Sequence, residues 1–247
     1  MGKSEGVIRL EAGGPAAIGL TPMTLDPADF QSPLPDQHIH LYYEAPEIGL
    51  SVGVWTTTDM QEAFGPYPGD EFMLLLEGRV VMVDGDGGET AIETGQTFVL
   101  RNGIPISWKQ EGFLRKLFLL YQNPAEAPPR VETAAGGILV LDPTTPGADL
   151  TPVDDPIGGG QQRERVIFTN DAGSLTVGEW ESSAFASQPQ PYGVHEFVQL
   201  IEGAVTITEL NGEEQQFQAG DVFFIPKGTH CGWRAEGPVR KYYVAVT

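Results

Sequence analysis

The chain contains two similar halves. Trp55 recurs as Trp180, and the same spacing of 125 residues relates a series of further residues without any gap. A repeat of this length is a duplicated domain, because solenoid units are only about 20–50 residues long. The 247 residues are therefore expected to form two related domains of about 110 residues each. The other identical pairs are Pro66 and Pro191, Tyr67 and Tyr192, Glu71 and Glu196, Phe72 and Phe197, Glu77 and Glu202, Gly78 and Gly203, Gly95 and Gly220, Gly103 and Gly228, Trp108 and Trp233, Arg115 and Arg240, and Lys116 and Lys241.

The similarity extends upstream with small shifts, since residues 6–10 resemble residues 137–141. Each half thus opens with a short strand and a proline-rich arm. We expect this arm to cross onto the other half or onto a second subunit. Prolines near the join predict a stiff connector. The predicted parts are an N-terminal domain over residues 1–123, a proline-rich linker over residues 124–136 and a C-terminal domain over residues 137–247.

The apolar runs are short and are separated by turns rich in glycine and proline, of which the chain has 31 and 20. Short β-prone runs with regularly spaced turns are typical of all-β sandwiches and barrels. No helical periodicity longer than about two turns is present. The fold is therefore predicted to be all-β. The runs are residues 72–76, 80–83, 98–100 and 117–121 in the first half, and 197–201, 205–207, 222–225 and 242–246 in the second.

The net charge of −20 and the isoelectric point of about 4.4 disfavour binding to nucleic acid or to anionic membranes. The single cysteine, Cys231, excludes an internal disulfide framework. Without a leader or a long apolar span, the expected location is cytoplasmic. The expected partner is a small molecule, and a homodimer through barrel edges is the expected oligomer.

Two motifs in each half suggest a family. In the second half, the run from Glu196 to Gly203 is followed by Gly220, Pro226 and Gly228 in a turn, strand and turn pattern. These residues resemble the two motifs of the cupin superfamily, so the chain looks like a bicupin. The resemblance implies two tandem cupin barrels, each a double-stranded β-helix or jelly roll. The continuation through residues 229–244 is similar to the branch of ethanolamine-utilisation and (S)-ureidoglycine aminohydrolase-like cupins.

The chain departs from this family at the positions of the metal ligands. The resemblance places a metal at positions held here by Gln190, Tyr192, Glu196 and Cys231. A first-row transition metal needs three or four good donors, and this set supplies Glu196 and at most Cys231. We expect no metal or other cofactor, with a divalent metal such as manganese in the C-terminal barrel alone as the alternative. The first half, which has Gly65, Tyr67, Glu71 and Ile106 at these positions, is predicted to be a degenerate, metal-free barrel.

The four histidines do not restore a metal site. His38 and His40 have ligand-like spacing, but they lie before the strand that carries Trp55 and indicate a surface or edge strand. His195 neighbours Glu196, so alternation along a strand turns it away from the interior, and His230 is related to Cys231 in the same way. Whether one of this second pair lines the mouth of a pocket stays open.

Glu71 and Glu196 need partners if they are buried, because a lone buried carboxylate is costly. Each half has an adjacent arginine and lysine in its last strand, Arg115 and Lys116 or Arg240 and Lys241. One residue of each pair must face inward. The inward cation is predicted either to form an internal ion pair in place of a metal or to anchor an anionic ligand.

The favoured function is small-molecule binding by a bicupin without a catalytic metal. The predicted pocket lies in the C-terminal barrel and is lined by Gln190, Tyr192, Glu196, Cys231 and Trp233. One alternative is a metal-dependent enzyme that acts on a small ureido or amino acid, as the resemblance to the aminohydrolase suggests. Another is a structural or assembly role. The repeated tryptophans are expected to pack in the core by default.

Overall fold

The computed structural model describes residues 6–15, 19–126, 137–144 and 149–247. The described chain is built of strands, and its only helical segments are the 3₁₀ turns η1 (Pro27–Asp29) and η2 (Pro124–Glu126). This confirms the all-β prediction. None of the described helices could cross a membrane.

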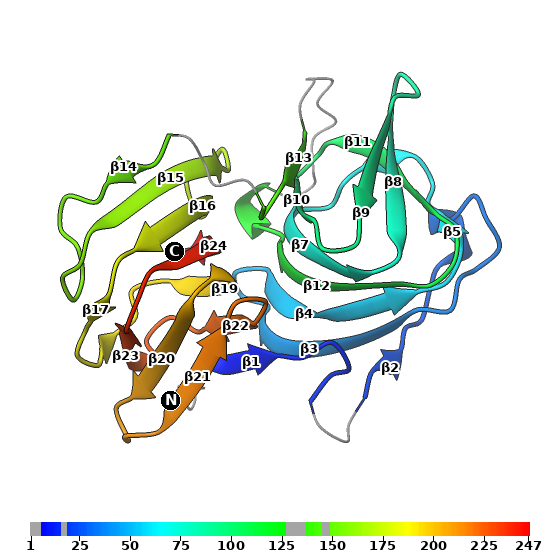
Figure 1. Ribbon diagram of the computed structural model, residues 1–247. Helices are drawn as coiled ribbons and strands as arrows, with labels where there is room; N and C mark the ends of the chain where they lie inside the picture. Colours follow the sequence, from blue (N-terminus) through cyan, green and yellow to red (C-terminus); the bar gives the residue numbers. More distant parts are fainter. Residues whose placement is uncertain (1–5, 16–18, 127–136, 145–148) are drawn as a thin grey trace. The chain divides into compact units, whose positions relative to one another are not determined.

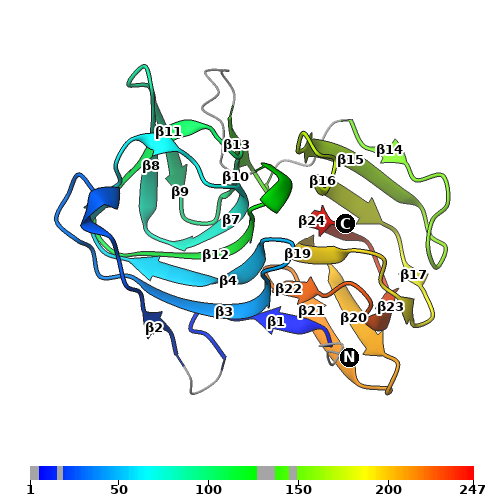
Figure 2. The same ribbon diagram turned by 180° about the vertical axis from the view of Figure 1, so that it is seen from behind.

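The chain forms two compact units (Figures 1 and 2). Glu11–Thr144 form one unit, called the N-terminal barrel below. Met1–Leu10 and Thr145–Thr247 form the other, called the C-terminal barrel. Within the described residues, each unit contains one sheet of seven strands and one of five.

The N-terminal barrel has a seven-stranded antiparallel sheet in the order β13-β10-β7-β12-β4-β3-β2. Its smaller sheet has the order β5-β11-β8-β9, with β6 also pairing with β11. The apolar runs of the first half lie in β7, β8, β10 and β12, as predicted. The strand bounds are β2 Thr21–Pro22, β3 His38–Ala45, β4 Leu50–Thr57, β5 Met60–Gln61, β6 Gly65–Pro66, β7 Asp70–Glu77, β8 Arg79–Asp84, β9 Glu89–Glu93, β10 Thr97–Leu100, β11 Pro105–Gln110, β12 Leu114–Tyr121 and β13 Ile138–Leu141.

The C-terminal barrel repeats this topology. Its larger sheet has the order β1-β22-β19-β24-β16-β15-β14, and its smaller sheet has the order β17-β23-β20-β21 with β18 on β23. The strand bounds are β1 Ile8–Leu10, β14 Thr151–Pro152, β15 Gln162–Thr169, β16 Leu175–Ser182, β17 Phe185–Ala186, β18 Gln190–Pro191, β19 His195–Glu202, β20 Ala204–Glu209, β21 Glu214–Gln218, β22 Val222–Ile225, β23 His230–Ala235 and β24 Val239–Val246.

The first strand of each half pairs within the barrel of the other half. Strand β1 is antiparallel to β22, with Ile8 opposite Phe224. Strand β13 is antiparallel to β10, with Leu139 opposite Val99. The opening strands thus cross between the halves, whereas β2 and β14, which lie farther along the two arms, pair with β3 and β15 of their own half. The exchange pairs sheet edges that would otherwise expose backbone hydrogen-bonding groups.

Because of this exchange, the compact units do not follow the predicted domain boundaries. Residues 6–10 belong with the C-terminal barrel and residues 137–144 with the N-terminal barrel. Of the predicted linker, residues 124–126 form η2, and residues 127–136 lie outside the described part of the chain.

The repeated Glu-Gly step forms the same tight turn in both barrels. Gly78 lies between β7 and β8 with φ +88°, and Gly203 lies between β19 and β20 with φ +80°. A Cβ atom at either position would collide with a backbone carbonyl, of Phe113 or Pro238 respectively. Glycine is therefore required at both turns by conformation and by space.

Candidate functional site

The interior of the C-terminal barrel contains a buried ion pair at the position where the family resemblance implies a metal. Glu196 projects from β19 and Lys241 from the neighbouring strand β24. Lys241 Nζ lies 2.6 Å from Glu196 Oε1, and the two side chains are only 9% and 7% exposed. The hydroxyl of Tyr192 donates to Glu196 Oε2. Both carboxylate oxygens of Glu196 are thus occupied by protein donors.

Aromatic rings surround the ammonium group of Lys241. Its Nζ lies 4.6 Å from the ring centre of Trp233, 5.2 Å from that of Trp180 and 5.6 Å from that of Tyr243. Cation–π attraction over such faces supports a buried lysine, since it replaces part of the lost hydration. The repeated tryptophans therefore stabilise the lysine charge in addition to packing in the core.

The N-terminal barrel has the same arrangement. Lys116 Nζ lies 2.8 Å from Glu71 Oε1, with side chains 8% and 5% exposed, and Tyr67 donates to Glu71 Oε2. Lys116 Nζ also lies 4.9 Å from the ring centres of both Trp55 and Trp108. The predicted internal ion pair is confirmed in both barrels, and the lysine, not the arginine, is the residue that faces inward.

A cavity of about 130 Å³ lies beside Lys241 in the C-terminal barrel. Four of the five predicted pocket residues line it: Gln190, Tyr192, Cys231 and Trp233. The fifth, Glu196, does not line the cavity but binds Tyr192 and Lys241. Most of the wall that was not predicted comes from segments before the two motifs, whereas Lys241 follows them on β24. The further lining residues are Ile157, Gln162, Trp180, Phe185, Ser187 and Lys241.

The cavity's acidic groups hold their protons tightly. Burial raises the pKa of the Cys231 thiol to about 12, and the charges of Glu196 and Glu209 add to the effect. Burial and Glu196 also raise the pKa of Tyr192 well above its usual value. At neutral pH the cavity therefore presents a thiol and a phenol rather than a thiolate and a phenolate, and neither is an activated nucleophile.

Comparison with known proteins extends these observations. Residues 169–243 match the EutQ-like cupin domain family. A solved protein of unknown function from Pseudomonas syringae pv. tomato is 24% identical, with a TM-score of 0.76 over 98% of this chain and 99% of its own. This chain has the cupin fold. Its sequence matches no curated protein.

Other solved cupins share the fold at lower identity. A cupin 2 conserved barrel domain protein from Leptotrichia buccalis is 10% identical, with a TM-score of 0.56 over 91% of this cupin and 92% of its own chain. A variant of the salicylate 1,2-dioxygenase from Pseudoaminobacter salicylatoxidans is 12% identical, with a TM-score of 0.53 over 80% and 71% of the two chains. At such identities the likeness concerns the fold alone.

The donor set of this cupin does not fit a transition metal. Of the side chains at the ligand positions, Gln190 is an exposed amide, Tyr192 and Cys231 are protonated, and Glu196 is bound by Lys241. A cation would have to displace the lysine ammonium and would then find one carboxylate, whereas three or four good donors are needed. The described residues contain no cluster of three or more His, Cys, Asp or Glu side chains suited to a metal.

The histidines of this cupin lie away from the cavity lining. His195 is 9% exposed, stacks on Phe224 and accepts a hydrogen bond at Nδ1 from the backbone N of Lys227, at 3.2 Å. His230 is exposed. His38 and His40 lie on β3 and are partly exposed. The alternation argument therefore placed His195 and His230 correctly.

The two barrels differ in whether the N–H group of a buried tryptophan has a hydrogen-bond partner. In the N-terminal barrel, Trp108 Nε1 donates to Gln110 Oε1 at 2.9 Å. The corresponding Trp233 Nε1 is buried and has no hydrogen-bond partner within the described chain, because Ala235 takes the place of Gln110. A buried donor without a partner costs about 1–3 kcal/mol.

Glu62 in the N-terminal barrel gives a testable pH dependence. Burial foremost raises its pKa from 4.5 to about 7; nearby Glu71 and Asp29 raise it further, against the charge of Lys116. The folded state then holds the proton more tightly than the unfolded chain, so stability falls as pH rises from about 4.5 to about 7 and stays lowered above that range. Glu62→Gln should therefore stabilise the protein by about 1–3 kcal/mol at pH 8, and hardly at all at pH 4.5.

Urea unfolding of the wild-type protein and of the Glu62→Gln variant at pH 4.5, 6 and 8 checks this expectation. The matched control is Glu111→Gln, because Glu111 is an exposed glutamate of the same barrel. An equal effect of Glu62→Gln at all three pH values would contradict the assignment.

Proposed function

We propose that this cupin binds a small molecule in its C-terminal barrel and does so without a metal ion. The observation that carries the proposal is the cavity of about 130 Å³ beside the Lys241–Glu196 pair. An engineered apolar cavity of about 150 Å³ in another protein holds benzene, so the volume suits a molecule of about six non-hydrogen atoms. Apolar walls with a few convergent polar groups are the usual form of a ligand site.

Differences between the duplicated barrels support binding over a purely structural role. Ile106 of the N-terminal barrel is 3% exposed and fills the position that Cys231 holds in the cavity wall. Met73 likewise stands where the C-terminal barrel has Val198. The C-terminal barrel thus keeps smaller side chains around Lys241, although close packing would be the more stable arrangement.

The chemistry of the site also supports binding over the metal-dependent aminohydrolase alternative. A hydrolase of that kind would need a metal to activate water, and the side chains at the ligand positions do not fit one. The remaining polar groups, Lys241, Glu196 and Tyr192, are engaged with one another. This arrangement fixes the positions of Lys241 and Tyr192 in the cavity wall.

Filling the cavity gives a direct test. Cys231→Ile, which copies the N-terminal barrel, is expected to abolish binding of small fragments while the protein stays folded, because the larger isoleucine side chain occupies the cavity. Binding is measured by protein-observed NMR with a panel of molecules of about six non-hydrogen atoms. The matched control is Ile106→Cys in the other barrel, which should leave binding unchanged.

Two results would contradict the proposal. One is unaltered fragment binding by the Cys231→Ile protein. The other is near-stoichiometric manganese, iron, zinc or nickel in protein purified without a chelator, which would favour the metal-dependent alternative.

A further inference from the structure

Three polar side chains in the wall of the C-terminal cavity have their partners inside the protein. Lys241 Nζ donates to Glu196 Oε1 at 2.6 Å, and three aromatic ring centres lie 4.6, 5.2 and 5.6 Å from that nitrogen. Tyr192 donates to the second carboxylate oxygen of Glu196. Gln162 Nε2 donates to two backbone oxygens of the preceding loop, at 2.7 and 3.0 Å. These interactions hold the three side chains without any contribution from a ligand.

The other polar groups of the wall offer little to a molecule inside the cavity. Trp233 Nε1 has almost no accessible surface, so its N–H group cannot be reached. Ser187 Oγ accepts a hydrogen bond from the backbone N of Trp233 at 2.9 Å, and the thiol of Cys231 is only a weak donor. Gln190 is exposed, so its amide is open to solvent. A polar or charged group that entered the cavity would therefore lose its hydration and gain little in return.

Ile157 adds an apolar side chain to the wall that is not itself buried. It lines the cavity, yet it is 57% exposed. Its loop is fixed on both sides of it, because the backbone N of Val153 donates to Gln162 O at 3.0 Å and that of Ala186 donates to Gly158 O at 3.1 Å. Covering an isoleucine side chain is favourable. An apolar molecule in the cavity would cover this one.

The N-terminal barrel shows the corresponding segment over a filled interior. The segment between β2 and β3 corresponds to that between β14 and β15, and a backbone hydrogen bond of 2.8 Å joins it to Gln61, the repeat counterpart of Ala186. Phe30 of this segment is partly buried and packs against the core cluster that contains Ile106. The apolar interior thus gives Phe30 a surface to cover. In the C-terminal barrel, an apolar ligand would give Ile157 the same kind of surface.

We propose that the cavity takes a small uncharged molecule whose buried part is a hydrocarbon or aromatic group, and that Ile157 covers this group when it is bound. The rings of Trp180 and Phe185, with centres 5.5 Å apart and an angle of 76° between their planes, form the aromatic part of the wall. This inference rests on the proposed function, since it names the ligand class of the same cavity. It also adds Ile157 as a residue that contacts the ligand.

Two probes of the same shape test the ligand class. Benzene is compared with pyrazine, an uncharged ring of the same size whose nitrogens accept hydrogen bonds from water. Benzene should bind about tenfold more tightly in a protein-observed NMR titration, because pyrazine loses hydrogen bonds that the cavity does not replace. Equal or tighter binding of pyrazine would overturn the apolar class and leave the proposed function standing. Failure of both probes and of the whole fragment panel to bind would overturn the inference together with the proposed function.

The role of Ile157 is tested by Ile157→Ala. The affinity for benzene should fall at least about fourfold, which is the effect of burying one methylene group. The matched control is Val166→Ala, because Val166 is an apolar residue of the same barrel that is 55% exposed and lies outside the cavity wall. This control should leave the affinity unchanged.

A second measurement follows the exposure of Ile157 directly in the wild-type protein. Relaxation of its methyl groups by a soluble gadolinium chelate should fall by about half when benzene saturates the protein, because the ligand covers the methyl surface. The methyl groups of Val166 should show no such change. Unchanged affinity in Ile157→Ala, or unchanged relaxation of the Ile157 methyl groups, would overturn the role of Ile157.

Discussion

Replacing Lys241 with methionine is expected to lower the free energy of unfolding by about 3–5 kcal/mol, because it leaves a buried carboxylate without its counter-ion. Glu196 is 7% exposed, and the ammonium group lies 2.6 Å from its Oε1. The tyrosine hydroxyl on the other oxygen supplies one hydrogen bond but no charge. Methionine preserves the length and apolar stem of the lysine, so packing changes contribute little to the measured difference.

The double variant Lys241→Met/Glu196→Gln is the internal control. Removing both charges should recover most of the lost stability, since a neutral pair needs no compensation in an apolar interior. Chemical denaturation at pH 7 measures the stability of the single and the double variant. The curves are fitted with one shared dependence of the unfolding free energy on denaturant concentration. The equivalent change Lys116→Met should behave in the same way, because Lys116 and Glu71 are paired at 2.8 Å with similar burial. A decrease in the free energy of unfolding below about 1 kcal/mol, typical of exposed pairs, would show that the interior ion pair does not stabilise the barrel.

The arginines beside these lysines should differ strongly between the barrels. Arg240 is 5% exposed and binds Glu179, which is fully buried, at 3.2 Å, and Glu202 at 2.7 Å. Its counterpart Arg115 is 31% exposed and lies 3.6 Å from Glu77. Arg240→Met is therefore expected to destabilise the protein by about 3 kcal/mol, whereas Arg115→Met should cost less than about 1 kcal/mol.

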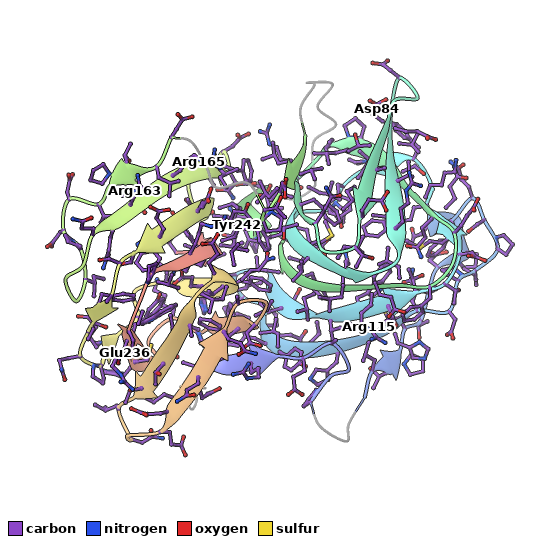
Figure 3. All side chains as sticks on the ribbon, in the orientation of Figure 1. Asp84, Arg115, Arg163, Arg165, Glu236 and Tyr242 are labelled. Atoms are coloured by element: carbon purple, nitrogen blue, oxygen red, sulfur yellow. The ribbon has the colours of Figure 1, made fainter. Side chains whose placement is uncertain are left out.

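The physical basis of this contrast is a single difference between the repeats. Glu179 stands where the first half has Val54, so only the C-terminal barrel buries a carboxylate at this point of the repeat. Arg165 of β15 also binds Glu179, at 2.9 Å, and Figure 3 shows Arg165 and Arg163 on that strand. Arg165 should limit the loss by retaining one counter-charge. Denaturation curves for the two arginine variants check the prediction, and equal losses would contradict it.

The candidate site could be predicted from the sequence where strand periodicity decides the outcome. Glu196 and Cys231 were placed in the interior, and His195 and His230 away from it, because successive side chains on a strand face opposite sides. The same parity required one residue of each arginine–lysine pair to face inward. It could not select the lysine, because selection depends on the partners opposite. Those are Glu196 for Lys241 and Glu179 with Glu202 for Arg240.

Part of the cavity wall could not be predicted from the sequence, for a different reason. Ser187 and Phe185 precede the motifs in segments that carry weak periodicity, and they reach the cavity through pairing with β23, where Phe185 lies opposite Ala235. The lack of a hydrogen-bond partner for Trp233 Nε1 could not be predicted from the sequence either. Alignment of the repeats relates Gln110 to Ala235, but only the structure shows that the first binds the tryptophan and that the second cannot.

By itself, the sequence determined that this protein is a duplicated all-β cupin with a carboxylate and a cation inside each barrel. These features follow from local alternation, from turn glycines and from a repeat in register, which can all be read from the order of residues along the chain. Only the tertiary structure decided that strands β1 and β13 are exchanged between the halves and that lysine is the inward cation. It also decided that the C-terminal barrel keeps a cavity beside Lys241. Each of these depends on which distant strands pair and on how much space their side chains leave, and neither is encoded in any short stretch of sequence.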